Sequence, residues 1–395
     1  MTSFSPWPIY SKEEIDAATE VLQSGKVNYW TGNKVKKFEI KFANIVGTNF
    51  AIALSNGTVA IELALRALKI SNQDEVIVTS RTFIASVSSI VNSGARPVFA
   101  DVDRDTQNIN IESIKKVFTE KTKAIICVHL AGWPCDMDPI MQFAKNNNIF
   151  VIEDCAQAHG AVYKGKSVGS IGDIGCWSFC QDKIISTGGE GGMVTTNNKK
   201  LWNIIWSLKD HGKSKDLLES KDNQNGFRWL HSTFGSNYRM TEFQAAIGLI
   251  QIGKLTQWNK KRIDNLNTIY EGVKDLPNIR IPKYRCKECS CNFENGVYCK
   301  NAAYKCYLFV NGDEFLRNKI ITEINKEGVP CFYGSCSEVY LETAFKEEGL
   351  QPKIRLKVAK ELGETSLMFL IHPNLTQTEI DKTIKVIRKV ALQNI

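Results

Sequence analysis

The first half of the chain alternates short apolar runs with stretches that have the spacing of amphipathic helices. Residues 51–55 form one such run, and residues 58–70 follow it. Ile61 and Leu65 of the second stretch fall on one helix face. Continuous apolar runs are typical of strands buried on both faces, so the alternation predicts an α/β fold with a parallel or mixed sheet covered by helices. Further strands are expected at 75–79, 97–102, 123–130, 148–154, 175–179 and 191–196, and further helices at 84–92 and 138–147.

The pattern changes in the later part of the chain. Residues 241–270 have the apolar spacing of one long helix, with Lys and Arg on its outer face. After it, a strand is expected at 304–310 and a helix at 313–327, as in a smaller α+β unit. We therefore expect two domains, a large one at 1–255 and a small C-terminal one at 256–395.

Composition and charge argue against several classes of protein. The 395 residues carry 50 Lys and Arg against 42 Asp and Glu, a net charge of +8 spread along the chain, so no nucleic-acid partner is expected. No apolar run approaches the ~20 residues of a membrane span, and the N-terminus lacks the basic and apolar regions of a secretory signal. Without an export signal, the 12 Cys indicate a reducing compartment. We expect a cytoplasmic protein with no membrane partner.

One short motif matches a nucleotide-binding pattern, but its sequence context does not fit that function. Residues 160–167, GAVYKGKS, match the pattern of a phosphate-binding loop, which works only between a strand and the helix that follows it. The strand expected here ends near Asp154, several residues too early. The VGSIGDIG after Ser167 contains too much glycine to begin a stable helix. We interpret the motif as a surface hairpin that turns at 164–166.

Metal ligands are sparse in this sequence. No two of the five His have the spacing of a helical ligand pair. An insertion at 286–299 has close thiols that could hold a zinc ion, although no second C-x-x-C pair completes the site. These thiols are Cys286, Cys289, Cys291 and Cys299. We assign no metal to the functional site and leave zinc at the insertion open.

Residues whose side chains could bind or react with a ligand lie where strands are expected to end. Asp154 ends one buried run, Ser178 ends another, and Lys183 lies in the turn beyond it. Residues 56–58, Asn-Gly-Thr, join a strand to a helix, whose N-terminus is an anion-binding position. Ligands of an open α/β sheet bind at the carboxyl ends of its strands. A lysine, a buried acid and an anion cradle are together what pyridoxal 5′-phosphate requires.

In these and other segments the chain resembles the DegT/DnrJ/StrS family of sugar-nucleotide aminotransferases, which are fold-type-I pyridoxal-phosphate enzymes. The resemblance runs from about residue 8 to the C-terminus. It implies a large domain with a mixed, mostly parallel seven-stranded sheet flanked by helices, and a smaller C-terminal α+β domain. The segments that carry it are WTG (30–32), SNGTVAIELAL (55–65), TFIAS (82–86), ARPVFADVD (95–103), HLAGWPCDMDPI (129–140), EDCAQAHGA (153–161), GDIGCWSF (172–179), DK (182–183), TGGEGGMVTTN (187–197), HG (211–212) and GSNYRMTEFQAAIG (235–248).

The resemblance implies roles for residues around the cofactor ring. Lys183 would carry the aldimine, and Asp154 would pair with the pyridinium nitrogen and keep it protonated. Gln157 would lie near the ring hydroxyl, and Phe83 matches the aromatic position that stacks on the ring. Some dehydratases of the family have His in place of the lysine, so Lys183 favours transamination.

The resemblance also implies a phosphate site and a homodimer. Gly57 and Thr58 would donate hydrogen bonds to the phosphate, and Ser178 would add a hydroxyl. Asn237 matches the residue that reaches the phosphate from the partner subunit, so each active site would be shared between two chains.

The implied reaction moves an amino group from L-glutamate, which becomes 2-oxoglutarate, to a nucleotide-linked keto-deoxysugar. A 4-keto-6-deoxyhexose is favoured because the family uses it most, and the product would be an amino sugar nucleotide for surface glycans such as O-antigen. Amination at C3, a cyclitol ketone, or a non-catalytic regulatory role stay as alternatives. The chain departs from commoner members at Gln181-Asp182, at 286–299 and at 334–336, and these departures leave the sugar open.

Overall fold

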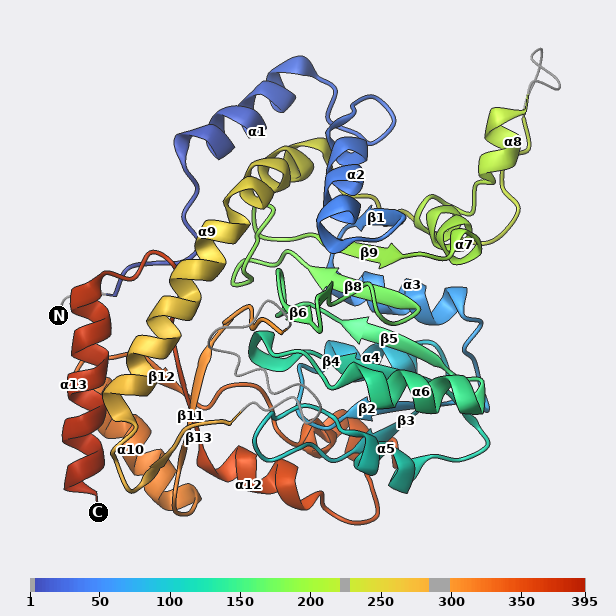
Figure 1. Cartoon of the computed structure of the whole chain (residues 1–395). Coiled ribbons are helices and arrows are strands. Elements are labelled where there is room, and N and C mark those ends of the chain that lie inside the picture. The colour runs from blue at the N-terminus through green and yellow to red at the C-terminus, as the bar shows by residue number, and fades with distance from the viewer. Residues whose placement is uncertain (1–3, 221–227, 284–298, 395) are drawn as a thin grey trace.

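The computed structural model describes residues 4–220, 228–283 and 299–394 (Figure 1). Its central feature is a seven-stranded sheet with the order β1-β9-β8-β5-β4-β2-β3. The strands predicted from the apolar runs are confirmed within a few residues. They are β1 (Phe50–Leu54), β2 (Glu75–Thr79), β3 (Arg96–Ala100), β4 (Thr122–Val128), β5 (Phe150–Asp154), β8 (Ile174–Ser178) and β9 (Gly192–Thr196).

All strands of this sheet except β9 run in the same direction, as the pairing of neighbours shows. No helix separates β8 from β9, and a pair joined without a crossover is antiparallel. The carboxyl ends of the six parallel strands therefore meet at one edge of the sheet. The turn between β8 and β9, residues 179–191, lies at that edge and contains Lys183.

Helices cover both faces of the large sheet (Figure 1). Alternate side chains of each strand point to opposite faces, so Ile52 and Leu54 of β1 join one core cluster while Ala51 and Ala53 join another. One face is covered by α3 (Gly57–Ala67), α4 (Ala85–Asn92) and α7 (Lys199–Lys209). The other is covered by α2 (Lys34–Val46), α5 (Ile111–Val117), α6 (Met137–Asn147) and α9 (Glu242–Val273).

A smaller antiparallel sheet has the order β10-β11-β13-β12. The strand predicted at 304–310 and the helix predicted at 313–327 are both present here. The elements of this unit are β10 (Ile279–Arg280), β11 (Cys306–Val310), β12 (Cys331–Phe332), β13 (Ser366–Phe369), α10 (Glu314–Lys326), α12 (Lys357–Thr365) and α13 (Gln377–Gln393). The short helix α11 (Thr343–Glu347) packs instead on the core of the large sheet, where Phe345 meets Phe99 of β3.

The long helix α9 connects the two sheets. Its first half packs against α1 (Lys12–Ser24) and α2, whereas Leu266, Ile269 and Val273 near its end belong to the core of the small sheet. The domain boundary expected after residue 255 falls inside this helix. The division into 1–255 and 256–395 therefore stays a prediction.

The phosphate-loop pattern forms the surface hairpin that its context predicts. Strands β6 (Val162–Tyr163) and β7 (Lys166–Ser167) pair across Gly165, which is exposed and has a φ of 81°. The next regular element after β7 is the strand β8, so no helix begins where a phosphate-binding loop needs one.

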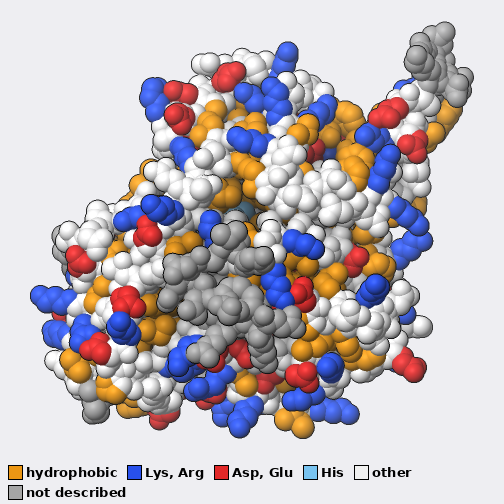
Figure 2. Space-filling model, in the orientation of Figure 1, with side chains coloured by type: hydrophobic (Ala, Val, Ile, Leu, Met, Phe, Trp, Pro, Cys, Tyr) orange, Lys and Arg blue, Asp and Glu red, His pale blue; other side chains and the backbone are white. Residues whose placement is uncertain are grey.

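Lys and Arg side chains are interspersed with Asp and Glu on the face shown in Figure 2. Among the residues that the structure describes, no helix is long and apolar enough to cross a membrane. The short helix α8 (Lys215–Glu219) projects from the body beside α7 (Figure 1).

Candidate active site

A cavity of about 720 Å³ lies at the carboxyl edge of the large sheet. Residues that follow β1, β2, β5 and β8 line it, as expected for a ligand site of an α/β fold. Seven of the eight residues predicted for the site are among them: Gly57, Thr58, Phe83, Asp154, Gln157, Ser178 and Lys183. The eighth, Asn237, is not.

The carboxylate of Asp154 ends β5 and is held from two sides. Its Oδ2 accepts a hydrogen bond from Ser86 Oγ at 2.7 Å, and its Oδ1 accepts one from the Ala156 backbone N–H at 3.1 Å. Ser86 is in turn bonded to the hydroxyl of Thr82 at 2.8 Å. Asp154 is 6% exposed, so the carboxylate is fixed in a mostly water-free wall of the cavity. Ser86 lies within the TFIAS segment but had no predicted role.

The neighbouring Glu153 is fully buried and fixes the strand that carries Asp154. It accepts hydrogen bonds from the backbone N–H groups of Gly169, Ile171 and Gly172 and contacts His129 Nε2 at 3.0 Å. His129 Nδ1 accepts from the Cys135 backbone, so Nε2 carries the proton and donates it to Glu153. Because their polar atoms are already used in this way, we interpret His129 and Glu153 as structural residues, although with Cys155 they are close enough to surround a metal ion.

The N-terminus of α3 and the end of β8 form an anion cradle. Asn56 Oδ1 accepts from the Val59 backbone N–H at 2.9 Å and so caps the helix. A Cβ added at Gly57 would lie 2.7 Å from the Cβ of Ser178, so only glycine allows this approach. The first turn of α3 and the Ser178 hydroxyl thus face the same space, which fits a phosphate group.

The amine of Lys183 lies between two polar groups. Its Nζ is 3.2 Å from Asp182 Oδ1 and 3.4 Å from the hydroxyl of Tyr304, which donates a hydrogen bond to the other oxygen of Asp182. Burial alone would raise the pKa of Asp182, but the charge of Lys183 and the Tyr304 hydroxyl outweigh it and hold that pKa below its usual value. The Lys183 side chain is 19% exposed, which leaves its amine open to the cavity.

The N-terminal segment also holds the turn that contains Lys183. Trp7 Nε1 donates a hydrogen bond to the backbone carbonyl of Lys183 at 2.9 Å, and Tyr10 bonds to Ser186 at 3.0 Å. Trp7 and Tyr304 were not predicted, because each meets Lys183 only through the tertiary fold. Asp182 stood out in the sequence, but only as a departure from the family pattern.

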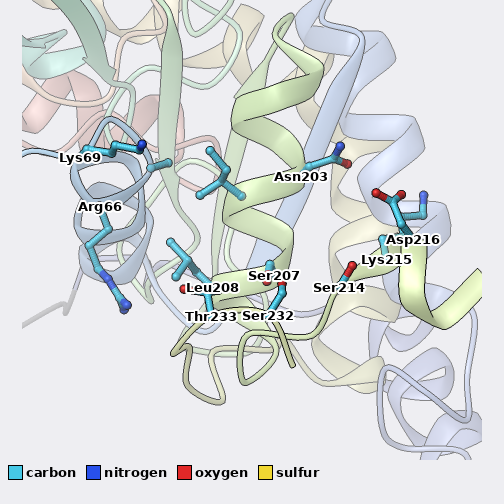
Figure 3. Close-up of a pocket in the computed structure, with 12 residues that line it drawn as sticks. Arg66, Lys69, Asn203, Ser207, Leu208, Ser214, Lys215, Asp216, Ser232 and Thr233 are labelled. Carbon is cyan, nitrogen blue, oxygen red and sulfur yellow. The ribbon is translucent and has the colours of Figure 1, made fainter. Parts of the chain in front are cut away.

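Asn237 lies outside the cavity within this chain. It is exposed, and its backbone pairs with Asp210 just beyond α7. A second cavity, of about 480 Å³, lies nearby between α3, α7 and the segment around Thr233. Figure 3 shows Arg66 of α3 and Lys69, just after α3, on one side of that cavity and Asn203 of α7 on the other. None of the eight predicted site residues lines it.

The possible zinc site is formed by cysteines of the insertion at 286–299. Cys286, Cys289 and Cys291 lie outside the described residues, so the possible zinc site remains open. Cys299 is described and buried, and its sulfur accepts a hydrogen bond from the Lys164 backbone at 3.3 Å.

The fold and the site define a fold-type-I pyridoxal-phosphate enzyme, and comparison with known proteins identifies its family. The model of the DegT/DnrJ/EryC1/StrS aminotransferase family matches residues 8–388, and the chain belongs to this family. It is 44% identical over 365 residues to a GDP-perosamine synthase from Caulobacter vibrioides, covering 91% of this chain and 90% of the relative.

Solved structures agree with this assignment. The aminotransferase from Psychrobacter cryohalolentis is 54% identical and superimposes with a TM-score of 0.94 over 99% of both chains. A putative sugar aminotransferase from Streptococcus pneumoniae, Spr1654 in its pyridoxamine-phosphate (PMP) form, is 28% identical with a TM-score of 0.88 over the full length of both chains. The chain is therefore a pyridoxal-phosphate-dependent sugar aminotransferase.

Proposed function

We propose that the chain transfers the amino group of L-glutamate to a nucleotide-linked keto-deoxysugar, a 4-keto-6-deoxyhexose in the first instance. The observation that carries this proposal is the meeting of the Lys183 amine, the buried Asp154 carboxylate and the anion cradle of α3 in one cavity. A relative named GDP-perosamine synthase supports a nucleotide-linked sugar as the acceptor. The amino sugar nucleotide formed would serve surface glycan synthesis.

The residues that line the cavity fit pyridoxal phosphate. The bound cofactor supplies an electron sink for the bonding electrons left when a proton is removed from the substrate carbon. Asp154, oriented by Ser86 and Ala156, would stabilise a proton on the pyridine nitrogen. Gly57, Thr58 and Ser178 would hold the phosphate, and Phe83 and Gln157 would contact the ring.

Lys183 would act as the base and acid of both half-reactions. Its amine would take the proton from the donor carbon and give it back on the other side of the transferred nitrogen, and it would move a proton in the opposite sense when the sugar is aminated. Asp182 and Tyr304 would stabilise the ammonium formed when the amine accepts that proton, because the carboxylate and the hydroxyl both lie within 3.5 Å of it.

We propose further that two chains associate and share their active sites through Asn237. Two exposed aromatic side chains favour such an assembly: Phe83, which lines the cavity, is 68% exposed, and Phe234, close to Asn237 in sequence, is 93% exposed. The cofactor ring would cover part of Phe83, and we propose that the partner chain covers Phe234, as is typical of apolar side chains at interaction sites. Closed two-fold dimers are the commonest soluble assembly.

A panel of keto-sugar nucleotides, with L-glutamate as the donor and mass detection of the amine product, tests the proposed reaction. We expect amination of a 4-keto-6-deoxyhexose linked to a nucleoside diphosphate. Amination of a 3-keto sugar or of a cyclitol ketone instead would show that the acceptor is wrong while the transaminase assignment holds. If no amino donor converts the cofactor, the result would favour a regulatory member of the family.

A further inference from the structure

A smaller cavity of about 330 Å³ adjoins the cofactor cavity on the side of Lys183. Asp182 lines both cavities. The other walls come from distant parts of the sequence: the N-terminal segment through Trp7, the helix α9 through Arg262, the start of β11 through Tyr304 and Lys305, and residues of the small sheet unit around His372. A ligand in this cavity would therefore lie next to the reacting lysine.

Two cations line this cavity, and neither forms an ion pair with an acid among the described residues. Arg262 is 1% exposed, and among the described residues its guanidinium donates one hydrogen bond, from Nη1 to the Tyr304 carbonyl at 3.3 Å. Its Nε and Nη2 have no partner there, and its Cζ lies 4.9 Å from the centre of the Trp7 ring. Lys305 Nζ lies 4.8 Å from the centre of the Tyr304 ring. No described carboxylate is within ion-pair distance of either cation.

The acids nearest to these cations are already engaged. Both oxygens of Asp182 are occupied, one by Lys183 and one by Tyr304. Glu379, beyond the outer wall, accepts hydrogen bonds from the backbone and hydroxyl of Ser5. Asp182 acts on Arg262 and Lys305 only through its charge, so among the described residues each cation lacks a carboxylate bonded to it, and together with Lys183 the cations outnumber this acid.

Burial is the main cause of the pKa shifts of the groups in this cavity. Burial lowers the pKa of Arg262 to about 9 and that of Lys305 to about 8. Burial, followed by repulsion from Arg262 and Lys305, lowers the pKa of His372 to about 3, so this imidazole is neutral and adds no third charge. A buried cation without a counter-ion is costly, and an anion in the cavity would remove part of that cost.

We propose that this cavity binds the anionic group of a substrate, with Lys305 as the direct ligand and Arg262 as a second positive charge behind it. The inference rests on the proposed function and adds a binding site to it. The chemistry recognised is a set of negatively charged oxygens, either a carboxylate of the amino donor or a phosphate of the nucleotide sugar. Bound there, the anion would place the reacting carbon of either substrate beside the Lys183 amine.

The test compares the holoenzyme with its Lys305→Gln variant in two ways. Calorimetry with glutarate and with inorganic pyrophosphate, which cannot react, measures anion binding directly. The two half-reactions, followed separately by cofactor absorbance, measure the concentrations of L-glutamate and of keto-sugar nucleotide that give half the limiting rate. We expect a loss of affinity of about tenfold or more for one class of anion, as for a lost charge-assisted hydrogen bond.

The two half-reactions show whether the bound anion is the carboxylate of the amino donor or the phosphate of the nucleotide sugar. Weaker use of L-glutamate and weaker glutarate binding identify a carboxylate site, whereas weaker use of the sugar nucleotide and weaker pyrophosphate binding identify a phosphate site. Lys305→Arg should keep the affinity, since it keeps the charge. Lys300→Gln is the matched control, because Lys300 is a partly buried lysine that does not line the cavity.

Equal affinity of wild type and Lys305→Gln for both probes and both substrates overturns the proposal, and so does a wild type that binds neither probe. Lys305→Met, which keeps the length of the side chain, replaces the Gln variant if that protein does not fold. If no amino donor converts the cofactor of the wild type, the proposed reaction is wrong, whatever the cavity binds. In that case the calorimetry still decides whether the cavity binds anions.

Discussion

Gly57 and Ser178 approach each other so closely that a methyl group on Gly57 would meet the side chain of Ser178 at 2.7 Å. The contact joins the first turn of α3 to the end of β8, two elements that lie far apart in the sequence. The shape of the anion cradle depends on it.

Gly57→Ala should therefore weaken binding of pyridoxal phosphate by tenfold or more, because the added methyl group must push α3 away from β8. The dissociation constant can be measured by absorbance titration of the apoenzyme. Gly253→Ala is the control: this residue lies in the helix α9 with open space around its Cβ position, so the change should leave cofactor binding unaltered and stabilise the helix by up to about 1 kcal/mol. Equal cofactor affinity in Gly57→Ala and wild type would contradict the role of this contact.

Ser86→Ala should lower turnover by about tenfold, since it removes one hydrogen bond that orients the Asp154 carboxylate. Asp154→Asn removes the charge itself and should cost orders of magnitude. Ser89→Ala is a matched control, because the Ser89 hydroxyl is bonded only to the Ala85 carbonyl within the same helix. Steady-state rates of the three variants test this ranking, and a fully active Asp154→Asn would show that another acid serves the ring.

Lys183→Ala should bind the cofactor without a covalent bond and should lose turnover by orders of magnitude. The wild type with cofactor should absorb in the violet region, and L-glutamate alone should bleach that band. Lys166→Ala, at the exposed hairpin between β6 and β7, should behave as wild type. Substantial turnover in Lys183→Ala would mean that another lysine reacts, and an inactive Lys166→Ala would reopen the phosphate-loop interpretation.

Asn237→Asp should impair cofactor binding, because its carboxylate would repel the phosphate across the dimer interface. Co-expression of Asn237→Asp with Lys183→Ala should restore part of the activity. One of the two sites in a mixed dimer then combines an intact Lys183 from one chain with an intact Asn237 from the other. Mixed dimers that form but stay inactive would show that Asn237 acts within its own chain or not at all.

His372 should make the protein less stable in acid. Its folded pKa of about 3 lies below the usual 6.5, so the unfolded chain binds a proton that the folded chain does not. As the pH falls from about 6.5 towards 3, the free energy of unfolding should therefore drop, by up to about 1.4 kcal/mol for each pH unit. His372→Phe, which can still stack on Trp7, should flatten this slope, whereas exposed His231→Gln should not. Thermal unfolding midpoints between pH 4 and 7 measure the difference.

The sequence predicts this fold well where the physical signal is local. The strands of the large sheet are buried on both faces, so each is a continuous apolar run that needs no knowledge of its neighbours. Seven of the eight proposed site residues lie at strand ends or in the turns just beyond, and the resemblance to a family adds their roles. The structure brings these seven residues together in one cavity, which agrees with the predicted roles. The roles themselves stay predictions.

The parts that could not be predicted depend on contacts between distant segments. Trp7 and Tyr304 meet the Lys183 turn from opposite ends of the chain, and neither carries a sequence signal of that contact. Ser86 is one of several serines near α4, and only the structure shows that its hydroxyl reaches Asp154. The role predicted for Asn237 involves a second chain and therefore stays a prediction.

The contact of Trp7 with the backbone of Lys183 has a consequence for how the protein is made. The segment that contains Trp7 is itself tied down by Glu379 of α13, which binds Ser5. During synthesis the first residues leave the ribosome long before α13 does, so Ser5 has no Glu379 to bind until translation is nearly finished. The contacts of Trp7 and Tyr10 with the turn that contains Lys183 can form earlier, because their partners precede α13 in the chain. Premature termination before α13 would thus leave that turn without the link between the two ends of the polypeptide.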